Sequence, residues 1–253
     1  ELPEEVRKAL DLVVLSPGVP TDIPIVKSFY EQGLPVWGEV ELAYRTGKGR
    51  VLAITGTNGK TTTTALLGKI MGDAEESVFV VGNIGTPYTS KALEMQDNTT
   101  TVAEISSFQL ETIEEFAPKV SAILNITEDH LNRHHTMEEY IRVKELIVKN
   151  QTADDFCILN YEDPVLREFG RNITPKVVYF SSVRRLEEGI YLDGDQIIYN
   201  PEILAPEFER SGYNSVWTDD ETDEWLQTVE NGIVTACSRT GGKGGWQLYS
   251  ISR

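Results

Sequence analysis

Short apolar runs alternate with amphipathic segments along most of this 253-residue chain. The apolar runs predict buried strands, and segments with apolar residues at helical spacing predict helices between them. Strands are predicted at Leu12–Leu15, Pro35–Val36, Val51–Ile54, Val78–Val81, Thr101–Glu104, Ala122–Asn125, Phe156–Asn160 and Lys176–Phe180. Helices are predicted at Glu4–Leu10, Ile25–Gln32, Glu39–Tyr44, Thr62–Ile70 and Met137–Lys149. This alternation predicts an α/β fold with a mainly parallel sheet.

Changes in this alternation predict three parts. Residues 1–48 hold very short elements without a complete glycine-rich first βα unit, so we expect them to be part of a Rossmann-like domain that begins before this chain does. Residues 49–200 carry the alternation and end in a hairpin over Gly189–Tyr199 that turns at Asp193–Gly194. Residues 201–253 predict a small α+β tail. Its expected elements are a helix over Thr218–Gly232 and a hairpin of Ile233–Ser238 with Trp246–Ser252.

The sequence VLAITGTNGKTTTT, residues 51–64, joins a predicted strand, a glycine turn and a helix start. A helix start offers unpaired N–H groups and the positive end of the helix dipole, and glycines let the backbone wrap around phosphate oxygens. A lysine in such a P-loop reaches the β- and γ-phosphates, and the hydroxyl after it binds Mg²⁺. The candidate residues are Gly56, Thr57, Asn58, Gly59, Lys60, Thr61 and Thr62. Ile54 stands where the general pattern has glycine, and the alternative is a tight turn that binds nothing.

Polar residues follow other predicted strands at the end where open α/β sheets bind ligands. Ser16–Pro20 is a turn at such an end, and either a structural turn or a ligand loop fits it. Glu104 ends a strand, where a carboxylate beside a P-loop would bind Mg²⁺. The alternative is a helix start capped by Ser106 or Ser107.

All three histidines of the chain lie within six residues after another predicted strand. His130, His134 and His135 stand there beside Asp129, and His130 is the best candidate for a metal ligand because imidazole binds divalent metals. The alternative is a polar surface loop. On the helix that follows, Lys144 adjoins an apolar stripe, and the default interpretation is a lysine whose ammonium group reaches solvent.

Charge and cysteine content narrow the class of protein. The formal net charge of −17 argues against general affinity for nucleic acid or anionic membranes, although local nucleotide sites remain open. The two cysteines, Cys157 and Cys237, lie in apolar strand-like runs, so we expect buried free thiols and a reducing cytoplasm. No apolar run approaches the ~20 residues of a membrane span, and no signal peptide is visible. The sequence sets no oligomeric state.

Six motifs together resemble the Mur ligase family of peptidoglycan synthesis, and within it the enzymes that add D-glutamate. They are SPGVP, GTNGKTTT, VGNIGTP, EISSFQLE, NITEDHLNRH and YIRVK, in family order over roughly Leu10–Tyr199. The resemblance implies an ATP-dependent ligase that joins D-glutamate to UDP-N-acetylmuramoyl-L-alanine. In that chemistry the substrate carboxylate attacks the γ-phosphate of ATP, and the amine of D-glutamate then displaces phosphate from the acyl phosphate.

The resemblance also implies catalytic and metal-binding roles. Lys60 would bind the phosphates and Thr61 a Mg²⁺ ion. Glu104 and His130 would hold Mg²⁺ between ATP and the acyl group. Lys144 matches a lysine that is carbamylated in the family, and the resulting anion would help to hold a second Mg²⁺. Lys60, His130 and Lys144 are therefore the expected catalytic residues.

Substrate-binding roles follow from the same resemblance. Asn83 and Ser106 would contact the UDP-muramoyl substrate. Ser16, Pro17 and Gly18 of the SPGVP motif are further expected substrate contacts.

The sequence departs from the family pattern at several places. Asn132 stands where aspartate is usual, and His135 where glycine is common. After Tyr199 neither an HN-x-x-N motif nor a domain that binds D-glutamate follows, so we expect this chain alone to hydrolyse ATP slowly without completing ligation. A nucleotide-binding module without ligase activity and another member of the Mur and folylpolyglutamate ligase superfamily remain alternatives. The SSFQLE motif favours the D-glutamate enzymes over the latter.

Overall fold

The computed structural model describes residues 3–200, 236–240 and 245–249. An eight-stranded sheet with the order β10-β9-β8-β7-β6-β3-β5-β4 forms its centre. The strands are β3 (Arg50–Thr55), β4 (Val78–Gly82), β5 (Thr100–Glu104), β6 (Val120–Ile123), β7 (Phe156–Asn160), β8 (Lys176–Ser181), β9 (Gly189–Asp193) and β10 (Gln196–Asn200). Neighbours pair in parallel from β4 to β9, and β10 pairs antiparallel with β9. The predicted α/β fold with a mainly parallel sheet is confirmed.

The order of the strands places the carboxyl end of β3 at a crevice. From β3 the chain runs to β4 at one edge, returns to β5, and then crosses to β6 on the other side of β3. Open α/β sheets bind ligands where the winding changes direction in this way, because the connections on either side leave a gap beyond the strand ends. The residues that follow β3, β5 and β6 are therefore brought together.

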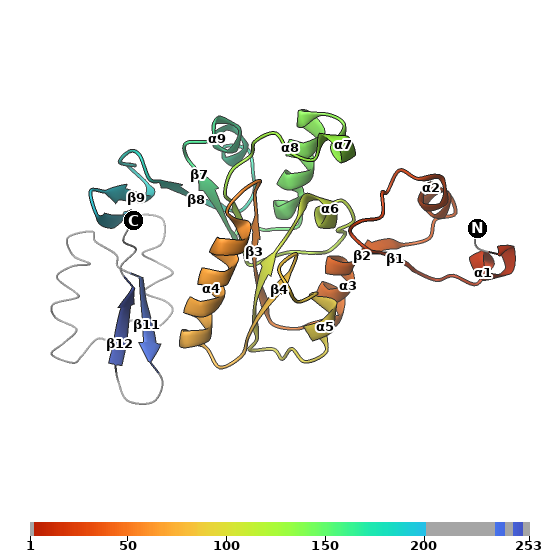
Figure 1. Ribbon diagram of the computed structural model, residues 1–253, viewed down its shortest axis with the longest axis horizontal. Coiled ribbons are helices and arrows are strands. Elements are labelled where there is room, and N and C mark those ends of the chain that lie inside the picture. The colour runs from red at the N-terminus through yellow and green to blue at the C-terminus, as the bar shows by residue number, and fades with distance from the viewer. Residues whose placement is uncertain (1–2, 201–235, 241–244, 250–253) are drawn as a thin grey trace.

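Helices cover both faces of the sheet (Figure 1). They are α1 (Glu4–Lys8), α2 (Pro24–Glu31), α3 (Glu39–Thr46), α4 (Lys60–Ala74), α5 (Thr89–Ala92), α6 (Ser107–Leu110), α7 (Leu131–His134), α8 (Met137–Glu145) and α9 (Pro164–Gly170), with a 3₁₀ turn at Leu146–Val148. On one face Leu67 and Met71 of α4 pack against a cluster that includes Ile54. On the other, Tyr140 of α8 and Leu166 of α9 belong to the main core.

The first part of the chain has a small core of its own. Strands β1 (Val13–Leu15) and β2 (Val36–Gly38) pair in parallel, and Leu15, Val26, Phe29 and Val36 form the core that they share with α2. Figure 1 shows these elements to one side of the main sheet, with α3 next to it. Val40 and Ala43 of α3 already lie in the main core. The division at residue 48 stays a prediction, and the packing of α3 shows that the two parts share a contact surface.

Most predicted elements are present with boundaries shifted by one or two residues. The hairpin of β9 and β10 turns at Gly194–Asp195, one residue later than predicted. Helices α5, α7 and α9 had not been predicted, although Asp163 followed by Pro164 is a typical start for α9. In the tail, β11 (Ala236–Thr240) and β12 (Gly245–Tyr249) pair antiparallel, which confirms a hairpin there. The helix predicted over 218–232 lies outside the described residues.

Two composition-based expectations can be checked in the described residues. Cys157 is a buried free cysteine, as predicted, and burial raises the pKa of its thiol to about 12. The side chain of Cys237 lies outside the described part. Within the described ranges, no helix has the length and apolar character that crossing a bilayer would require.

Candidate active site

The P-loop follows β3 and leads directly into α4. Gly56 has φ 141° and Gly59, the N-cap of α4, has φ 83°, so both adopt left-handed backbone that favours glycine. A Cβ atom at Gly56 would lie 3.1 Å from that of Leu124, which leaves little room for any side chain. The N-terminal N–H groups of this 15-residue helix therefore stand at the carboxyl end of β3, where an anion can approach them.

The loop is held from outside by residues that follow β6. The Asn125 side chain accepts a hydrogen bond from the Asn58 N–H at 2.8 Å and donates one to the Asn58 carbonyl at 3.0 Å. The Thr57 hydroxyl lies 3.0 Å from the Thr127 nitrogen, whose N–H donates to it, and 3.1 Å from the Tyr140 hydroxyl. These contacts occupy the hydroxyl group of Thr57 and hold the loop in place. We therefore expect the backbone N–H groups of the loop to bind phosphate. Asn125 was not predicted as a site residue, although its place directly after a strand could have suggested it.

Two lysine side chains converge on one carbonyl oxygen of the loop. Lys60 Nζ lies 3.0 Å from the Gly56 oxygen and 2.9 Å from that of Thr57. Lys144 Nζ lies 2.8 Å from the same Gly56 oxygen. No ion pair joins a carboxylate to either ammonium group within the described residues. Two lysine nitrogens therefore share a partly buried position beside a phosphate-type loop, and an anion bound there would favour the charged form of both.

The interpretation of Lys144 as a lysine that reaches solvent is wrong. Its side chain is 2 % exposed, and its ammonium group lies beneath the P-loop and 4.9 Å from the centre of the Tyr140 ring. The pKa of Lys144 is lowered from 10.5 to about 7, mainly by burial and also by the charge of Lys60, while Asp129 opposes the shift. At neutral pH a substantial fraction of Lys144 is therefore an uncharged, nucleophilic amine.

Glu104 carries an unpartnered oxygen at the end of β5. The residue is 1 % exposed, and its Oε1 accepts a hydrogen bond from Asn83 Nδ2 at 2.8 Å. Its Oε2 is buried without a hydrogen-bond partner in the described part of the chain. In the β3–β5 register Glu104 lies opposite Ile54, which comes two residues before Gly56 of the P-loop. A buried carboxylate oxygen without a partner is costly, and a cation such as Mg²⁺ would satisfy it.

Thr61 and Thr62, the other predicted residues of this loop, are exposed in the first turn of α4.

The three histidines do not converge. His130, with φ 52°, is 48 % exposed at its side chain, and its Nε2 lies 3.4 Å from Asp129 Oδ2. His134 is buried and contacts Ser107, and its pKa is lowered by burial. His135 points to Asp22 at 3.8 Å on the surface. Among the described residues, no group of three or more histidine, cysteine or acidic side chains forms a metal site.

The remaining predicted substrate residues lie where the first part of the chain meets α6. Ser106 is the N-cap of α6 and forms a capping box with Gln109, which is the structural alternative considered from the sequence. A small cavity separates α6 from the turn after β1, and its lining includes Ser16 and Pro17. Gly18 is exposed in the same turn. The SPGVP turn thus faces the segment that follows Glu104.

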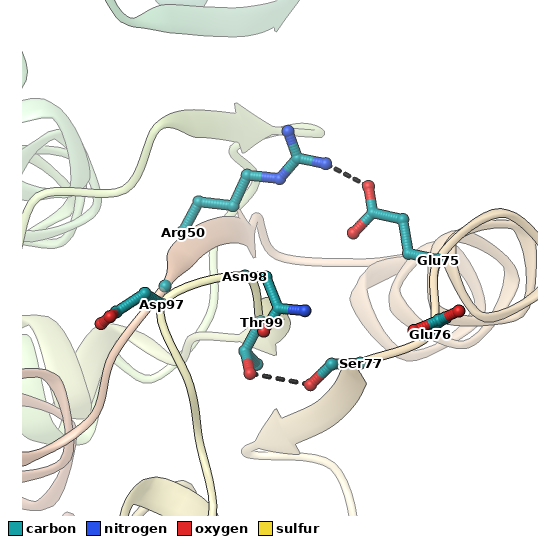
Figure 2. A pocket seen from close by; sticks show the side chains of 8 residues that line it. Arg50, Glu75, Glu76, Ser77, Asp97, Asn98 and Thr99 are labelled. Carbon is teal, nitrogen blue, oxygen red and sulfur yellow. Dashed lines mark hydrogen bonds and ion pairs between the residues drawn. The ribbon is translucent and has the colours of Figure 1, made fainter.

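A wide surface cavity of about 680 Å³ lies at the opposite edge of the sheet (Figure 2). Arg50 at the start of β3 pairs there with Glu75 after α4, and Ser77 contacts Thr99 through their hydroxyl groups at 2.8 Å. These contacts tie the end of α4 to the amino ends of β3 and β5. The P-loop follows the carboxyl end of β3, so this cavity is separate from the candidate site.

Comparison with known proteins identifies what the chain is similar to. The family profile described as "Mur ligase middle domain" matches residues 54–200. A UDP-N-acetylmuramoylalanine–D-glutamate ligase of Lachnoclostridium phytofermentans is 59 % identical over 198 residues, which cover 78 % of this chain and 44 % of the relative. The enzyme of the same name from Clostridioides difficile is 50 % identical over 197 residues, with the same coverage. The chain thus spans less than half the length of the curated relatives it matches.

One solved structure supports the fold. It is a UDP-N-acetylmuramoyl-L-alanyl-D-glutamate–2,6-diaminopimelate ligase, 19 % identical in sequence, with a TM-score of 0.50. The match covers 76 % of this chain and 52 % of the solved chain. At this identity the likeness concerns the arrangement of the elements alone.

Proposed function

Because the chain belongs to the Mur ligase family, we propose that it carries the ATP-binding centre of a ligase that joins D-glutamate to UDP-N-acetylmuramoyl-L-alanine. The single observation that carries the proposal is the P-loop between β3 and α4, where the N-terminus of a 15-residue helix and the Lys60 ammonium group lie together and offer a site for a polyphosphate anion. The identity to D-glutamate ligases supports the substrate pair. A cytoplasmic location fits the use of ATP.

The proposed reaction assigns tasks to the residues of this chain. Backbone N–H groups at the start of α4 and the ammonium group of Lys60 bind the phosphates and offset the charge that develops on them. The alanyl carboxylate oxygen of UDP-N-acetylmuramoyl-L-alanine bonds to the γ-phosphorus as ADP leaves. The D-glutamate nitrogen then bonds to the acyl carbon as phosphate leaves, and the amine loses a proton.

Metal binding is proposed at Glu104, where the unpartnered Oε2 fits a cation. Thr61 on α4 and His130 beyond β6 would complete the ligands. When bound, Mg²⁺ would neutralise phosphate charge and orient the γ-phosphate. Asn83 holds the other oxygen of Glu104 and thereby orients the carboxylate, which is a role in addition to the proposed substrate contact.

We further propose that Lys144 is carbamylated. The ammonium group would first lose one proton. The neutral amine nitrogen would then attack the carbon of CO₂, form an N–C bond as one C=O π bond opens, and lose a second proton, which leaves an anionic carbamate. The exchange removes the repulsion between Lys144 and Lys60. It also supplies carboxylate-type oxygens for a second Mg²⁺.

Thermal-shift measurements with Mg·ATP test the nucleotide site. The melting temperature of the parent chain should rise with ligand, because a ligand that binds only the folded state stabilises it. Lys60→Ala should abolish the rise. Lys48→Ala is the matched control, since Lys48 is exposed and pairs with Asp97. No rise in the parent would contradict the proposal.

The same measurement tests the metal site without an activity assay. Glu104→Gln should keep a shift with ATP alone but lose the extra shift that Mg²⁺ adds. An unchanged Mg²⁺ increment would show that Glu104 does not bind the metal.

A further inference from the structure

The guanidinium group of Arg133 lies between the SPGVP turn and the segment that follows β5. Its Nη2 donates to the Val19 carbonyl at 3.1 Å. It also forms a two-point ion pair with Glu111, with Nε to Oε1 at 3.2 Å and Nη2 to Oε2 at 2.5 Å. The two side chains are only 14 % and 11 % exposed. We call this two-point contact the Arg133 fork. Such a contact fixes both the distance and the angle between the guanidinium and carboxylate groups, which a single-point contact does not.

Glu111 extends the contact into the interior. Its Oε1 lies 3.5 Å from His134 Nδ1, and His134 Nε2 lies 2.9 Å from the Ser107 hydroxyl. The Phe108 ring contacts both side chains, with its centre 5.5 Å from that of the His134 ring and 5.3 Å from the Arg133 guanidinium. The Arg133–Glu111 pair is therefore packed against buried side chains and is not an exposed surface pair.

His130 is fixed by the same short helix. The N–H groups of Arg133 and His134 both donate to the His130 carbonyl, at 2.9 and 3.0 Å. On the other side, the Val19 N–H donates to the Ser16 carbonyl at 2.9 Å and closes the SPGVP turn. The Arg133 side chain thus connects the backbone segment that carries His130 with the backbone segment that carries Ser16.

This connection matters because the two segments belong to different cores. The first part of the chain packs around Leu15 and Phe29, whereas α7 lies against the main core. A small cavity lies at this boundary, between the turn and α6. The polar fork of Arg133 crosses it.

We propose that Arg133 is a positioning residue for the muramoyl substrate, which holds the SPGVP turn at a set distance from the loop of His130 so that one substrate can contact both. The inference rests on the proposed function. It assigns to Arg133 no contact with the reacting atoms.

Parallel titrations with UDP-N-acetylmuramoyl-L-alanine and with Mg·ATP, followed by calorimetry, test the proposal. The variants are Arg133→Lys, which keeps the charge beside Glu111 but loses the two-point contact, and Arg133→Gln, which keeps an amide NH₂ donor group but loses the charge. The matched control is Arg142→Lys, because Arg142 forms a similar two-point pair with Glu139 on the exposed surface of α8. Affinity for the muramoyl nucleotide should fall about tenfold or more in both Arg133 variants. Affinity for Mg·ATP should stay within about twofold.

The ratio of the two affinities separates the outcomes. An unchanged affinity for the muramoyl nucleotide, or an equal loss of affinity for both ligands, would overturn the positioning role. A residue with a merely structural role would weaken the binding of both ligands. If the parent chain binds Mg·ATP but not the muramoyl nucleotide, the proposed substrate is wrong and the inference falls with it. A selective loss in the Arg133 variants, absent from Arg142→Lys, supports it.

Discussion

At the scale of single residues, Lys144 is the side chain whose environment departs furthest from that of an ordinary lysine. Its pKa is lowered from 10.5 to about 7, so its amine becomes neutral as pH rises through 7, whereas exposed lysines stay charged until about pH 10. With ¹³C-bicarbonate at pH 8, a carbamate resonance should appear in the parent chain and vanish in Lys144→Met. Its intensity should fall as the pH is lowered to 6. Persistence of the signal in Lys144→Met would assign it to another amine, and its absence from the parent would refute carbamylation.

His135 is strained at the level of its own backbone. It has φ 67° and ψ −44°, and the Thr136 N–H donates to the His134 carbonyl across it at 2.8 Å. Its surface pair with Asp22 contributes little. His135→Gly should therefore raise the free energy of unfolding by about 1 kcal/mol, measured by urea denaturation. Asn132→Gly, within α7, is the control and should lower it by up to about 1 kcal/mol. Equal destabilisation by both would show that His135 is not strained.

At the scale of elements, the P-loop depends on a residue outside it. Asn125 forms two hydrogen bonds with the backbone of Asn58. Asn125→Ala should weaken Mg·ATP binding about tenfold, because a loosened loop must be ordered when the phosphates bind. Asn150→Ala is the matched control, since the Asn150 side chain also donates two hydrogen bonds to backbone, to the Glu114 and Phe116 carbonyls.

The two asparagine variants can be compared directly. Each should lower the free energy of unfolding by about 1–3 kcal/mol, through the loss of two hydrogen bonds. Calorimetry should detect weaker nucleotide binding only for Asn125→Ala. Equal nucleotide affinity in both variants would show that the hydrogen bonds to Asn58 do not preorganise the loop.

At the scale of the whole molecule, Glu41 joins α3 to the connection between α6 and β6. It is fully buried, and its carboxylate accepts hydrogen bonds from the N–H groups of Glu114, Glu115 and Phe116 at 2.9–3.1 Å and pairs with Arg45. Burial raises the pKa of Glu41, but these hydrogen bonds outweigh it, and the net pKa is lowered. The carboxylate thus stabilises the folded chain when ionised.

The lowered pKa of Glu41 makes the free energy of unfolding depend on pH. A folded pKa below the ordinary value of 4.5 means that the stabilisation is present above pH 4.5 and is lost as pH falls through the lowered pKa. Glu41→Gln should cost about 2 kcal/mol at pH 7 in urea denaturation, and its stability should fall less steeply than that of the parent between pH 5 and 3. Exposed Glu138→Gln is the control. Parallel pH profiles for Glu41→Gln and the parent would contradict this role.

The amino-acid sequence by itself determined the features that depend on neighbours along the chain. Apolar runs such as Val51–Ile54 predicted strands, because a strand buried on both faces needs that composition. The turn from Gly56 to Lys60 predicted a helix start with a phosphate-type loop, because glycine conformations and exposed N–H groups are local properties. The motif order likewise predicted the family that residues 54–200 match.

Only the tertiary structure decided what depends on distant partners. Periodicity placed Lys144 beside an apolar stripe, but its burial beneath a loop 88 residues earlier follows from the packing of α8 on β3. Likewise, three histidines within six residues suggested one cluster, yet their polar contacts differ: His130 lies beside Asp129, His134 contacts Ser107 and His135 lies beside Asp22. Side-chain direction is set by the fold around each residue, and spacing along the chain does not contain it.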